Sequence, residues 1–378
     1  MPTALLVAHH YPPHVGGMEL VVQRQAQSMA ERGYRVVVLT SRTRSPQPAD
    51  DSSTDIEVVR ISSWHIMERL FFIPYPVFSP RLICEAWKHL TRATVVHIHD
   101  VFYISSWVVA VMARIAGKPI LLTQHVGMVE HNSRLVMCLQ RLVYATAGRW
   151  IFTAAHRIVV YNENVRAFLR GSGVPDERIL LLANGIDTRL FRPARADERA
   201  GIRKRFDLPP ARPLVLFVGR LVEKKGVHIL LGARDPDFDL VFAGPGTIPT
   251  GGSAAGVHWL GPVAQAQAAE LYRACDLFAF PAVGEIITLA MQEAMASGLP
   301  VLTTNDPAYA HTILADHIVL CRREAESLRV AIKELLADAP RLSSLGARSR
   351  EFALRHFDWN MNFAPLMSTY SDVMRSQP

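Results

Sequence analysis

Short apolar runs alternate with longer amphipathic runs along almost the whole chain of 378 residues, and this alternation constrains the fold more than any other feature. Short apolar runs bounded by Gly, Pro or polar residues are typical of strands buried on both faces, and the longer runs between them are typical of helices. The alternation predicts parallel sheets with helices on both faces. The expected strands are 4–8, 35–40, 56–60, 95–99, 119–123, 157–161 and 179–182, followed by 214–219, 239–243, 257–260, 276–280, 301–304 and 317–320.

The alternation breaks between Asn184 and Pro213, where Arg, Pro and Asp are frequent, and it resumes at Leu214. The predicted fold class is therefore α/β, with two Rossmann-like, doubly wound parallel sheets that face each other across a cleft. We expect an N-terminal domain over 1–183, a linker over 184–213, a second domain over 214–338, and helices over 339–378 that pack back across the domain joint.

Composition excludes several classes of protein. With 49% hydrophobic and 20% charged residues the chain is globular rather than disordered. The four cysteines are scattered without a CxxC pair, so we expect neither a zinc site nor a disulfide framework. The apolar run 4–8 has no basic region ahead of it and predicts a first strand rather than a signal peptide. Arg114 and Lys118 interrupt the best candidate for a membrane span. The scattered cysteines fit a reducing cytosol, so the expected location is cytoplasmic.

The net charge of +7 comes mainly from the N-terminal half, where residues 1–183 hold 19 Lys and Arg against 13 Asp and Glu. Basic residues interleaved with bulky apolar ones suit an anionic membrane surface better than a DNA groove, and a solvated helix face is the alternative. The arginines concerned are Arg134, Arg141, Arg149, Arg157, Arg166 and Arg170. Aromatic residues of the same half are Trp64, Phe71, Phe72, Tyr75 and Phe78.

The stretch GEIITLAMQEAMASGLP, residues 284–300, lies between two expected strands and forms a strand-loop-helix-strand unit. Glu285 follows the first strand directly, and Glu293 lies on the helix. On one continuous helix the two carboxylates would be about 80° apart, so they are expected to do different jobs. A structural cap or an arginine partner is the alternative role for each.

Two other motifs each follow the first strand of an expected domain. Gly16 and Gly17 open a helix, and backbone amides without a neighbouring Cβ can approach a phosphate closely there; a plain tight turn is the alternative. Arg220 and Lys225 follow the strand 214–219, where two cations can bind a negatively charged group without a metal; a solvated basic surface is the alternative.

Histidines mark the strand ends of the first half. His125 follows the strand 119–123, where an imidazole can face the expected cleft and hydrogen-bond a ligand, unless it is purely structural. His97 and His99 alternate along a strand and point to one face without a third ligand, so no metal site is expected.

In the right order and over nearly its full length, the chain resembles the retaining glycosyltransferases of family 4, which have the GT-B fold. The motifs that carry the resemblance are YPPHVGGMELVV, TQHVG, NGIDTRLFRP, GRLVEKKG, FAGPG and the Glu-x7-Glu segment. The family usually has Gly-Phe-Gly or Gly-Phe-Pro after the first glutamate, whereas this chain has Ile286-Ile287-Thr288, which restricts the loop backbone.

The resemblance implies roles for individual residues. It places Glu293 on the donor ribose and Glu285 on the donor sugar near the reacting carbon. The implied catalytic residues are His125, Glu285, Arg220 and Lys225, with no metal and no cofactor. The implied donor-binding residues are Gly16, Gly17, Arg220, Lys225, Gly246, Val263, Ile286, Ile287, Thr288, Leu289 and Glu293, and the acceptor-side residues are His99 and Asn184.

The predicted function is retaining transfer of a sugar from a nucleoside diphosphate sugar, with UDP favoured and GDP next, to an acceptor hydroxyl. A lipid-linked acceptor in glycan or cell-envelope assembly, with the enzyme peripheral on the cytoplasmic face of the membrane, fits the basic N-terminal half. A soluble small-molecule acceptor is the competing prediction. A nucleotide-sugar epimerase and a non-catalytic nucleotide-sugar-binding module are the alternatives from other classes, and nucleic acid is not an expected partner.

Overall fold

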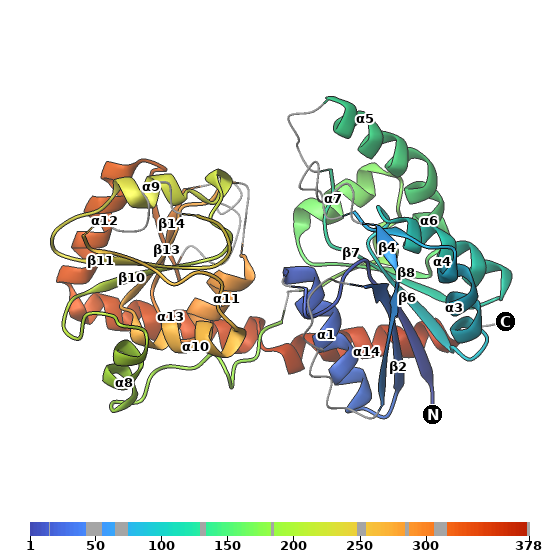
Figure 1. The fold of residues 1–378 in the computed structure, drawn as a ribbon, viewed down its shortest axis with the longest axis horizontal. Helices are drawn as coiled ribbons and strands as arrows, with labels where there is room; N and C mark the ends of the chain where they lie inside the picture. Colours follow the sequence, from blue (N-terminus) through green and yellow to red (C-terminus); the bar gives the residue numbers. More distant parts are fainter. Residues whose placement is uncertain are drawn as a thin grey trace. The chain divides into compact units, whose positions relative to one another are not determined.

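The computed structural model describes residues 1–14, 16–42, 55–64, 75–128, 134–182, 185–247, 255–283, 287–305 and 316–375. The chain divides into two compact units, the first of Met1–Asn184 with Asn362–Pro378 and the second of Gly185–Met361 (Figure 1). Each unit has its own parallel sheet.

The first unit is built on seven strands in the order β3-β2-β1-β6-β7-β8-β9. The order changes direction between β1 and β6, which makes this the switch point of a doubly wound sheet. The strands are β1 (Thr3–Val7), β2 (Arg35–Ser41), β3 (Ile56–Ile61), β6 (Val95–His99), β7 (Ile120–Gln124), β8 (Arg157–Val160) and β9 (Ile179–Leu181). Val, Ile and Leu dominate them because both faces of the sheet are covered. A small antiparallel pair, β4 (Ser63–Trp64) and β5 (Val77–Phe78), forms a separate sheet.

One face of this sheet carries an apolar layer of helices. The helices are α3 (Arg81–Leu90), α4 (Ile104–Ile115), α6 (Arg149–Ala154) and α7 (Glu163–Gly171). Leu5, Val96 and Leu122 of the strands pack with Leu90, Val109, Phe152 and Leu169 of these helices in one core cluster. α5 (Arg134–Val143) and a π-helical turn, η1 (Tyr144–Gly148), lead directly into α6. A short turn, η2 (Asp176–Arg178), precedes β9.

The opposite face is more polar and is covered by α1 (Gly17–Ala30) and by the C-terminal part of α14 (Trp359–Arg375). His97 of β6 hydrogen-bonds the hydroxyl of Tyr370 through Nδ1 and Thr123 Oγ1 through Nε2, the latter at 2.7 Å. Gln25 of α1 donates to the Tyr161 hydroxyl at 2.8 Å. α14 therefore begins in the second unit and closes the core of the first.

The second unit repeats the topology with six strands in the order β12-β11-β10-β13-β14-β15, which changes direction between β10 and β13. The strands are β10 (Leu214–Val218), β11 (Asp239–Ala243), β12 (Val257–Trp259), β13 (Leu277–Phe280), β14 (Val301–Thr304) and β15 (Val319–Cys321). In Figure 1, α9 (Val227–Gly232) and α12 (Ala325–Ala337) lie together over one face, and α10 (Gln265–Ala274), α11 (Leu289–Ala296) and α13 (Ala339–His356) lie over the other. A turn, η3 (Glu223–Lys225), precedes α9.

The stretch 184–213, which the sequence predicts as a linker, contains α8 (Glu198–Arg205) in the structure, and α8 packs on α10. Arg203 holds α8 in place because its buried guanidinium donates to the Ala274 carbonyl and Asp276 carboxylate, both at 2.9 Å. Three further carbonyls, of Pro209, Pro210 and Arg212, accept from the same group.

The predicted α/β fold of two doubly wound parallel sheets is confirmed, and the predicted strand ends differ from the observed ones by at most two residues. The β4–β5 pair was not predicted, because two-residue strands carry no periodic signal. Within the described ranges, no helix combines the length and the apolar character that crossing a bilayer requires.

Tyr370→Phe is expected to lower the free energy of unfolding by roughly 1–3 kcal/mol, because it leaves a buried ring nitrogen of His97 without its partner. Met361→Ala is the control, since Met361 lies on the same helix with 63% of its surface exposed. Urea unfolding followed by tryptophan fluorescence measures both. Equal midpoints for Tyr370→Phe and Met361→Ala would contradict a stabilising role for this hydroxyl.

Candidate active site

At the carboxyl edge of the second sheet, backbone hydrogen bonds join the turns that follow β10, β11 and β13. Gly219 N donates to the Ala243 carbonyl at 2.9 Å, and Leu221 N donates to the Pro245 carbonyl at 2.8 Å. Val283 N donates to the Lys224 carbonyl at 3.2 Å. The turn with the predicted cations is thus fixed from both sides.

Glycines permit this close packing. Gly226 has φ 74°, and a Cβ there would lie 2.1 Å from the Pro281 carbonyl oxygen. Gly244 has φ 141°, and a Cβ there would lie 2.0 Å from the Gly219 carbonyl oxygen. Any side chain at either position would push the turns apart.

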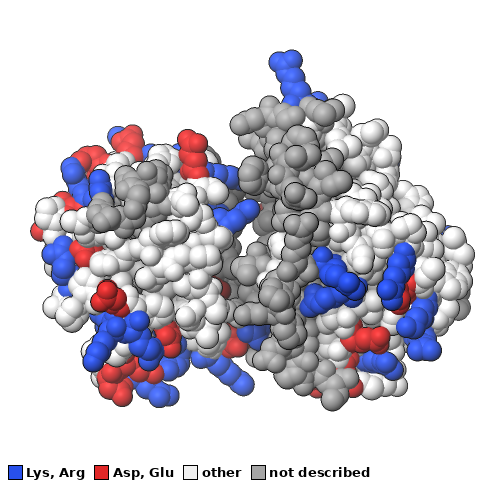
Figure 2. Space-filling view, viewed as in Figure 1, with Lys and Arg blue, Asp and Glu red and all other residues white. Residues whose placement is uncertain are grey.

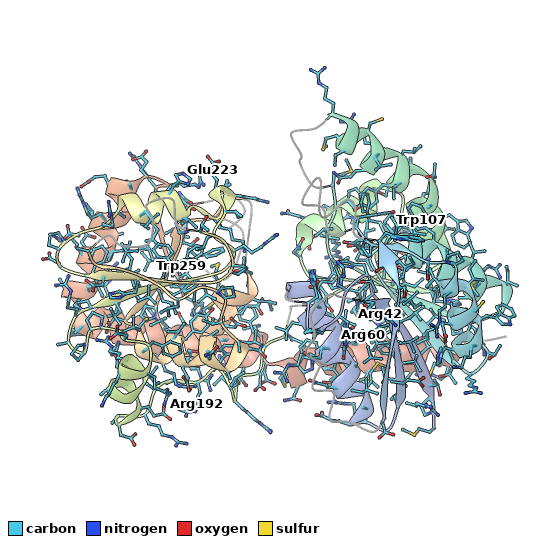
Figure 3. The ribbon with its side chains drawn as sticks, viewed as in Figure 1. Arg42, Arg60, Trp107, Arg192, Glu223 and Trp259 are labelled. Carbon is cyan, nitrogen blue, oxygen red and sulfur yellow. The ribbon has the colours of Figure 1, made fainter. Side chains whose placement is uncertain are left out.

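The structure places Arg220 and Lys225 on one turn beside β10. Arg220 is exposed, whereas Lys225 is half-buried with its Nζ 5.3 Å from the centroid of the Phe280 ring. Glu223 lies on the same turn (Figure 3). Gly246, with φ 123°, packs against Leu221 of this turn, since a Cβ there would be 2.8 Å from that of Leu221.

Glu293 lies in the second turn of α11 and is buried, with 8% of its surface exposed. The Tyr272 hydroxyl donates to its carboxylate at 3.0 Å. Burial raises the pKa of Glu293 to about 8, although the hydrogen bond from Tyr272 favours the carboxylate. The structure therefore has a partner for Glu293 that the sequence did not identify, and this partner fixes the direction of the carboxylate.

The loop before α11 is strained at one position. Ile287 has φ 50°, a left-handed conformation that is costly for a β-branched residue. The Gln292 side chain donates to the Ile287 carbonyl at 3.2 Å, and Thr288 Oγ1 accepts from Met291 N at 3.3 Å to cap α11. Leu289 opens α11, so the positive end of the helix dipole lies at this edge.

Three of the predicted site residues lie outside the part of the chain that the structure describes, and Val263 is described only by its burial. Glu285, Ile286 and Asn184 lie outside the described residues. Val263 is half-buried in the segment between β12 and α10.

At the carboxyl edge of the first sheet, a carboxylate borders the Gly16-Gly17 turn. A Cβ on Gly16 would lie 2.2 Å from Glu19 Oε2, so any side chain there would displace the end of the Glu19 side chain. His14 Nδ1 lies 2.8 Å from Glu19 Oε1. The place where we expected a phosphate is therefore next to a buried acid, which disfavours a second negative charge there.

The predicted histidines come together. His99 Nδ1 lies 3.2 Å from His125 Nε2, and the rings of His97 and His99 are 4.3 Å apart on one face of β6. Burial lowers the pKa values of His97 and His125 to about 3. Burial also lowers the pKa of His99 well below its usual value. These rings are neutral at pH 7, and the described residues contain no cluster able to hold a metal ion.

Two residues that sequence reasoning missed, His9 and Tyr103, adjoin this pair, as does Asp100, whose spacing from His97 and His99 resembles that of metal ligands. His9 follows β1 and stacks on Tyr103, with ring centroids 3.8 Å apart. Asp100 follows His99 with φ 68°, and burial raises its pKa to about 6. His9 Nδ1, His99 Nε2 and Asp100 Oδ2 are buried without a hydrogen-bond partner among the described residues. Their positions after β1 and β6, the two strands of the switch point, are the signal that could have found them.

Two arginines lie near the carboxyl ends of β2 and β3. Arg60 donates to the Pro12 carbonyl at 2.7 Å, and its guanidinium is 5.9 Å from the centroid of the Tyr11 ring. Arg42 N donates to the Ile61 carbonyl at 2.8 Å, next to Arg60 in sequence (Figure 3). The first sheet edge thus combines neutral imidazoles with a cationic border.

Two family models match the chain, Glycosyltransferase Family 4 over residues 15–190 and Glycosyl transferases group 1 over residues 198–352. The chain belongs to glycosyltransferase family 4. It is thus a glycosyltransferase of a retaining, metal-independent family and uses a nucleotide-sugar donor, as the sequence predicted. This membership sets aside the epimerase and the non-catalytic module.

Known proteins of similar sequence and fold extend over the whole chain. A D-inositol 3-phosphate glycosyltransferase from Rhodococcus jostii is 25% identical over 392 residues, covering 94% of this chain and 84% of the relative. One from Segniliparus rotundus is 27% identical over 401 residues, covering 95% and 85%. The structure of sucrose-phosphate synthase from Thermosynechococcus elongatus matches with a TM-score of 0.75 at 20% identity, covering 100% of both chains. Anabaena HepE in complex with UDP and glucose matches with a TM-score of 0.77 at 19% identity, covering 97% and 99%.

Glu293→Gln is expected to flatten the dependence of thermal stability on pH. The folded protein holds the proton of Glu293 up to about pH 8, whereas the ordinary pKa of a glutamate is 4.5, so wild-type stability falls as pH rises through this window. Glutamine cannot ionise. The variant should melt like wild type at pH 5 and several degrees higher at pH 8 in the absence of donor.

Differential scanning fluorimetry across the pH range measures the effect. Glu334→Gln on the exposed side of α12 is the matched control and should follow the wild-type curve. Parallel curves for Glu293→Gln and wild type would mean that Glu293 is not held protonated.

Proposed function

We propose that this glycosyltransferase moves a sugar from a UDP-sugar, or next in preference from a GDP-sugar, to an acceptor hydroxyl with retention of anomeric configuration. The proposed acceptor is lipid-linked or a glycan. The observation that carries the proposal is the rigid turn of the second unit with Arg220 and Lys225, beside the N-terminus of α11. A diphosphate is the leaving group whose growing charge such an arrangement stabilises.

On the donor side, each residue has a proposed task. Arg220 and Lys225 contact the diphosphate, while Glu293, oriented by Tyr272, accepts hydrogen bonds from the ribose hydroxyls. Gly246 lets the nucleotide approach the backbone, and Val263 packs against the base. UDP complexes are known for HepE, which supports UDP as the first choice.

The loop before α11 is proposed to select the sugar. Glu285 and the amides of Ile286 to Leu289 contact the donor sugar near the reacting carbon. Ile287 is held in a left-handed conformation where the family usually has phenylalanine between glycines, so this loop backbone is stiff. We expect the enzyme to accept few donor sugars, since a stiff loop adapts poorly to sugars that differ in the arrangement of their hydroxyl groups.

On the acceptor side, we propose that neutral imidazoles bind hydroxyl groups. His125 lies nearest the reacting carbon, where it stabilises the oxocarbenium-like state, and His99 and Asn184 hold the acceptor. Buried atoms of His9, His99 and Asp100 that have no hydrogen-bond partner within the described part of the chain support a hydroxyl-rich ligand, because buried polar atoms normally find partners. Gly16 and Gly17 allow close approach beside Glu19, and the diphosphate is left to the cations of the second unit.

A soluble acceptor is the second candidate. D-inositol 3-phosphate glycosyltransferases are similar over nearly the full chain, which favours a cyclitol phosphate or a related metabolite. Arg42 and Arg60, which lie at the edge of the first sheet, are the residues we would expect to meet its phosphate.

The diphosphate oxygen is proposed to take the proton of the acceptor hydroxyl as the glycosidic bond breaks, so attack and departure occur on one face of the sugar. The product is therefore expected to keep the anomeric configuration of the donor. Proton NMR of the purified product measures the coupling constant of the anomeric proton. An inverted product would overturn the mechanism.

Arg220→Ala and Lys225→Ala are each expected to lower kcat by about 10²–10³, because each removes a preorganised charge from the leaving group. Lys224→Ala is the matched control, since it removes an exposed cation from the same turn and should stay within about twofold of wild type. Release of nucleoside diphosphate measures turnover. Near-wild-type activity of Arg220→Ala would remove the diphosphate role from this turn.

Thermal denaturation with UDP, GDP, ADP, TDP and their sugar conjugates tests the donor without an acceptor. A ligand at 100 times its Kd stabilises the folded state by about 2.7 kcal/mol. We expect a rise in Tm with UDP, smaller in Arg220→Ala. A rise only with ADP or TDP would refute the proposed donor.

A further inference from the structure

The chain contains one long segment that is almost free of acidic residues. Between residues 101 and 162 there are six basic residues, Arg114, Lys118, Arg134, Arg141, Arg149 and Arg157, and one acidic residue, Glu130. The segment supplies α4, α5, η1 and α6, of which α4, η1 and α6 contribute to the core cluster on one face of the first sheet. Four of the six basic residues, Arg114, Arg134, Arg141 and Arg149, lie on these helices.

The helix that runs through α5, η1 and α6 has two unlike sides. Its inner side holds Tyr144, Ile151 and Phe152, which pack in the core of the first unit. Its outer side holds Arg141, Leu142, Arg149 and Trp150, and Leu142 and Trp150 remain 59% and 40% exposed. Bulky apolar side chains therefore alternate with arginines on the surface.

α4 extends this surface, because α4 and α6 are neighbours in the same layer. Ile115 near its end is 71% exposed, and Arg114 beside it is also exposed. We refer to Arg114, Ile115, Arg141, Leu142, Arg149 and Trp150 together as the α4–α6 face. None of its arginines forms an ion pair with a described residue.

Charges elsewhere on the protein behave differently. Arg166, also in the first unit, pairs with Asp176, and Arg192 of the second unit pairs with Glu198 at 2.6 Å. Figure 2 shows basic and acidic side chains next to one another over the end of the second unit that carries α8. Among the aromatic residues that the sequence analysis grouped with the arginines, Phe78 is buried and Tyr75 packs near Tyr103, whereas Trp64 is exposed. Phe71 and Phe72 lie outside the described residues.

We propose that the α4–α6 face docks the enzyme on the surface of an anionic bilayer. Arginines meet lipid phosphates there, while Leu142, Trp150 and Ile115 enter the boundary between headgroups and acyl chains. A nucleic acid would contact the arginines through its phosphates but would leave the apolar side chains exposed to water. Docking itself is inferred from the exposed residues of the face. Its role in bringing a lipid-linked acceptor to the first unit rests on the proposed function.

The position of the face suits that purpose. His125 stands at the carboxyl end of β7, and α5 begins at Arg134, the next helix along the chain. The face therefore belongs to the helices that follow β6 and β7, the two strands whose carboxyl ends carry the acceptor histidines.

Vesicle flotation of the full chain tests the proposal. The purified protein should float with vesicles of phosphatidylcholine mixed with phosphatidylglycerol at low salt, and not with phosphatidylcholine alone. High salt should release it, because screening weakens the phosphate contacts. Arg141→Gln combined with Arg149→Gln should weaken binding roughly 30-fold, from about 1 kcal/mol for each basic residue. Leu142→Gln combined with Trp150→Gln should also reduce binding and should leave its salt dependence in place.

Matched controls come from the second unit. Arg348→Gln removes an exposed arginine of α13, and Trp259→Gln removes a tryptophan that is 41% exposed, close to the value for Trp150. Both should bind anionic vesicles like wild type. Failure of wild type to float, equal binding to neutral vesicles, or equal losses in the control variants would overturn the proposal, as would retention of anionic binding in both face variants.

The donor measurement separates this proposal from the proposed function. The face variants should keep the rise in Tm with UDP, since they lie far along the chain from Arg220 and Lys225. Vesicle binding without a donor response would reject the proposed function and leave the docking face standing. A donor response without vesicle binding would do the reverse, and would favour a soluble acceptor.

Discussion

The second unit depends on three backbone turns that approach one another more closely than any side chain would permit. A Cβ at Gly226 or Gly244 would lie only 2.1 or 2.0 Å from a carbonyl oxygen, which is about the H···O distance of a hydrogen bond. This contact lets the turn after β10 rest on the ends of β11 and β13, and it fixes Arg220 and Lys225 relative to the start of α11. A preorganised charge is worth more in catalysis than a mobile one, because no rearrangement is needed as the leaving group forms.

The first unit solves a different problem. It buries several imidazoles between its sheet and the helices α1 and α14, and burial keeps them neutral by lowering their pKa values. Such a core is costly wherever a ring nitrogen lacks a partner. His97 has partners on both sides, in Tyr370 and Thr123, whereas His9 and His99 each keep one nitrogen without a hydrogen-bond partner among the described residues. His97 therefore has a structural role, whereas His9 and His99 can each form one more hydrogen bond to a ligand.

Much of this organisation was predictable from the sequence. Buried parallel strands are short apolar runs, so their number and ends could be predicted, and the cations after β10 and Glu293 on α11 follow from spacing. What the sequence did not show are contacts between distant segments: Tyr272 with Glu293, Tyr370 with His97, and His9 with Tyr103. The position of Glu19, three residues after the N-cap Gly16, was also not used in the prediction, although an acid there commonly folds back on the start of the helix. Local patterns predict elements, whereas these pairings depend on how elements are laid beside one another.

The helix α14 has a further consequence for how the protein is made. The first unit is not a continuous stretch of chain, since residues from Asn362 onward complete it after the whole second unit has been synthesised. At about 5–20 residues per second, the ribosome needs on the order of 10–35 s to pass from residue 185 to residue 361. During that interval the face of the first sheet that bears His97 has no Tyr370 to cover it. The second unit therefore has time to fold before the first is closed.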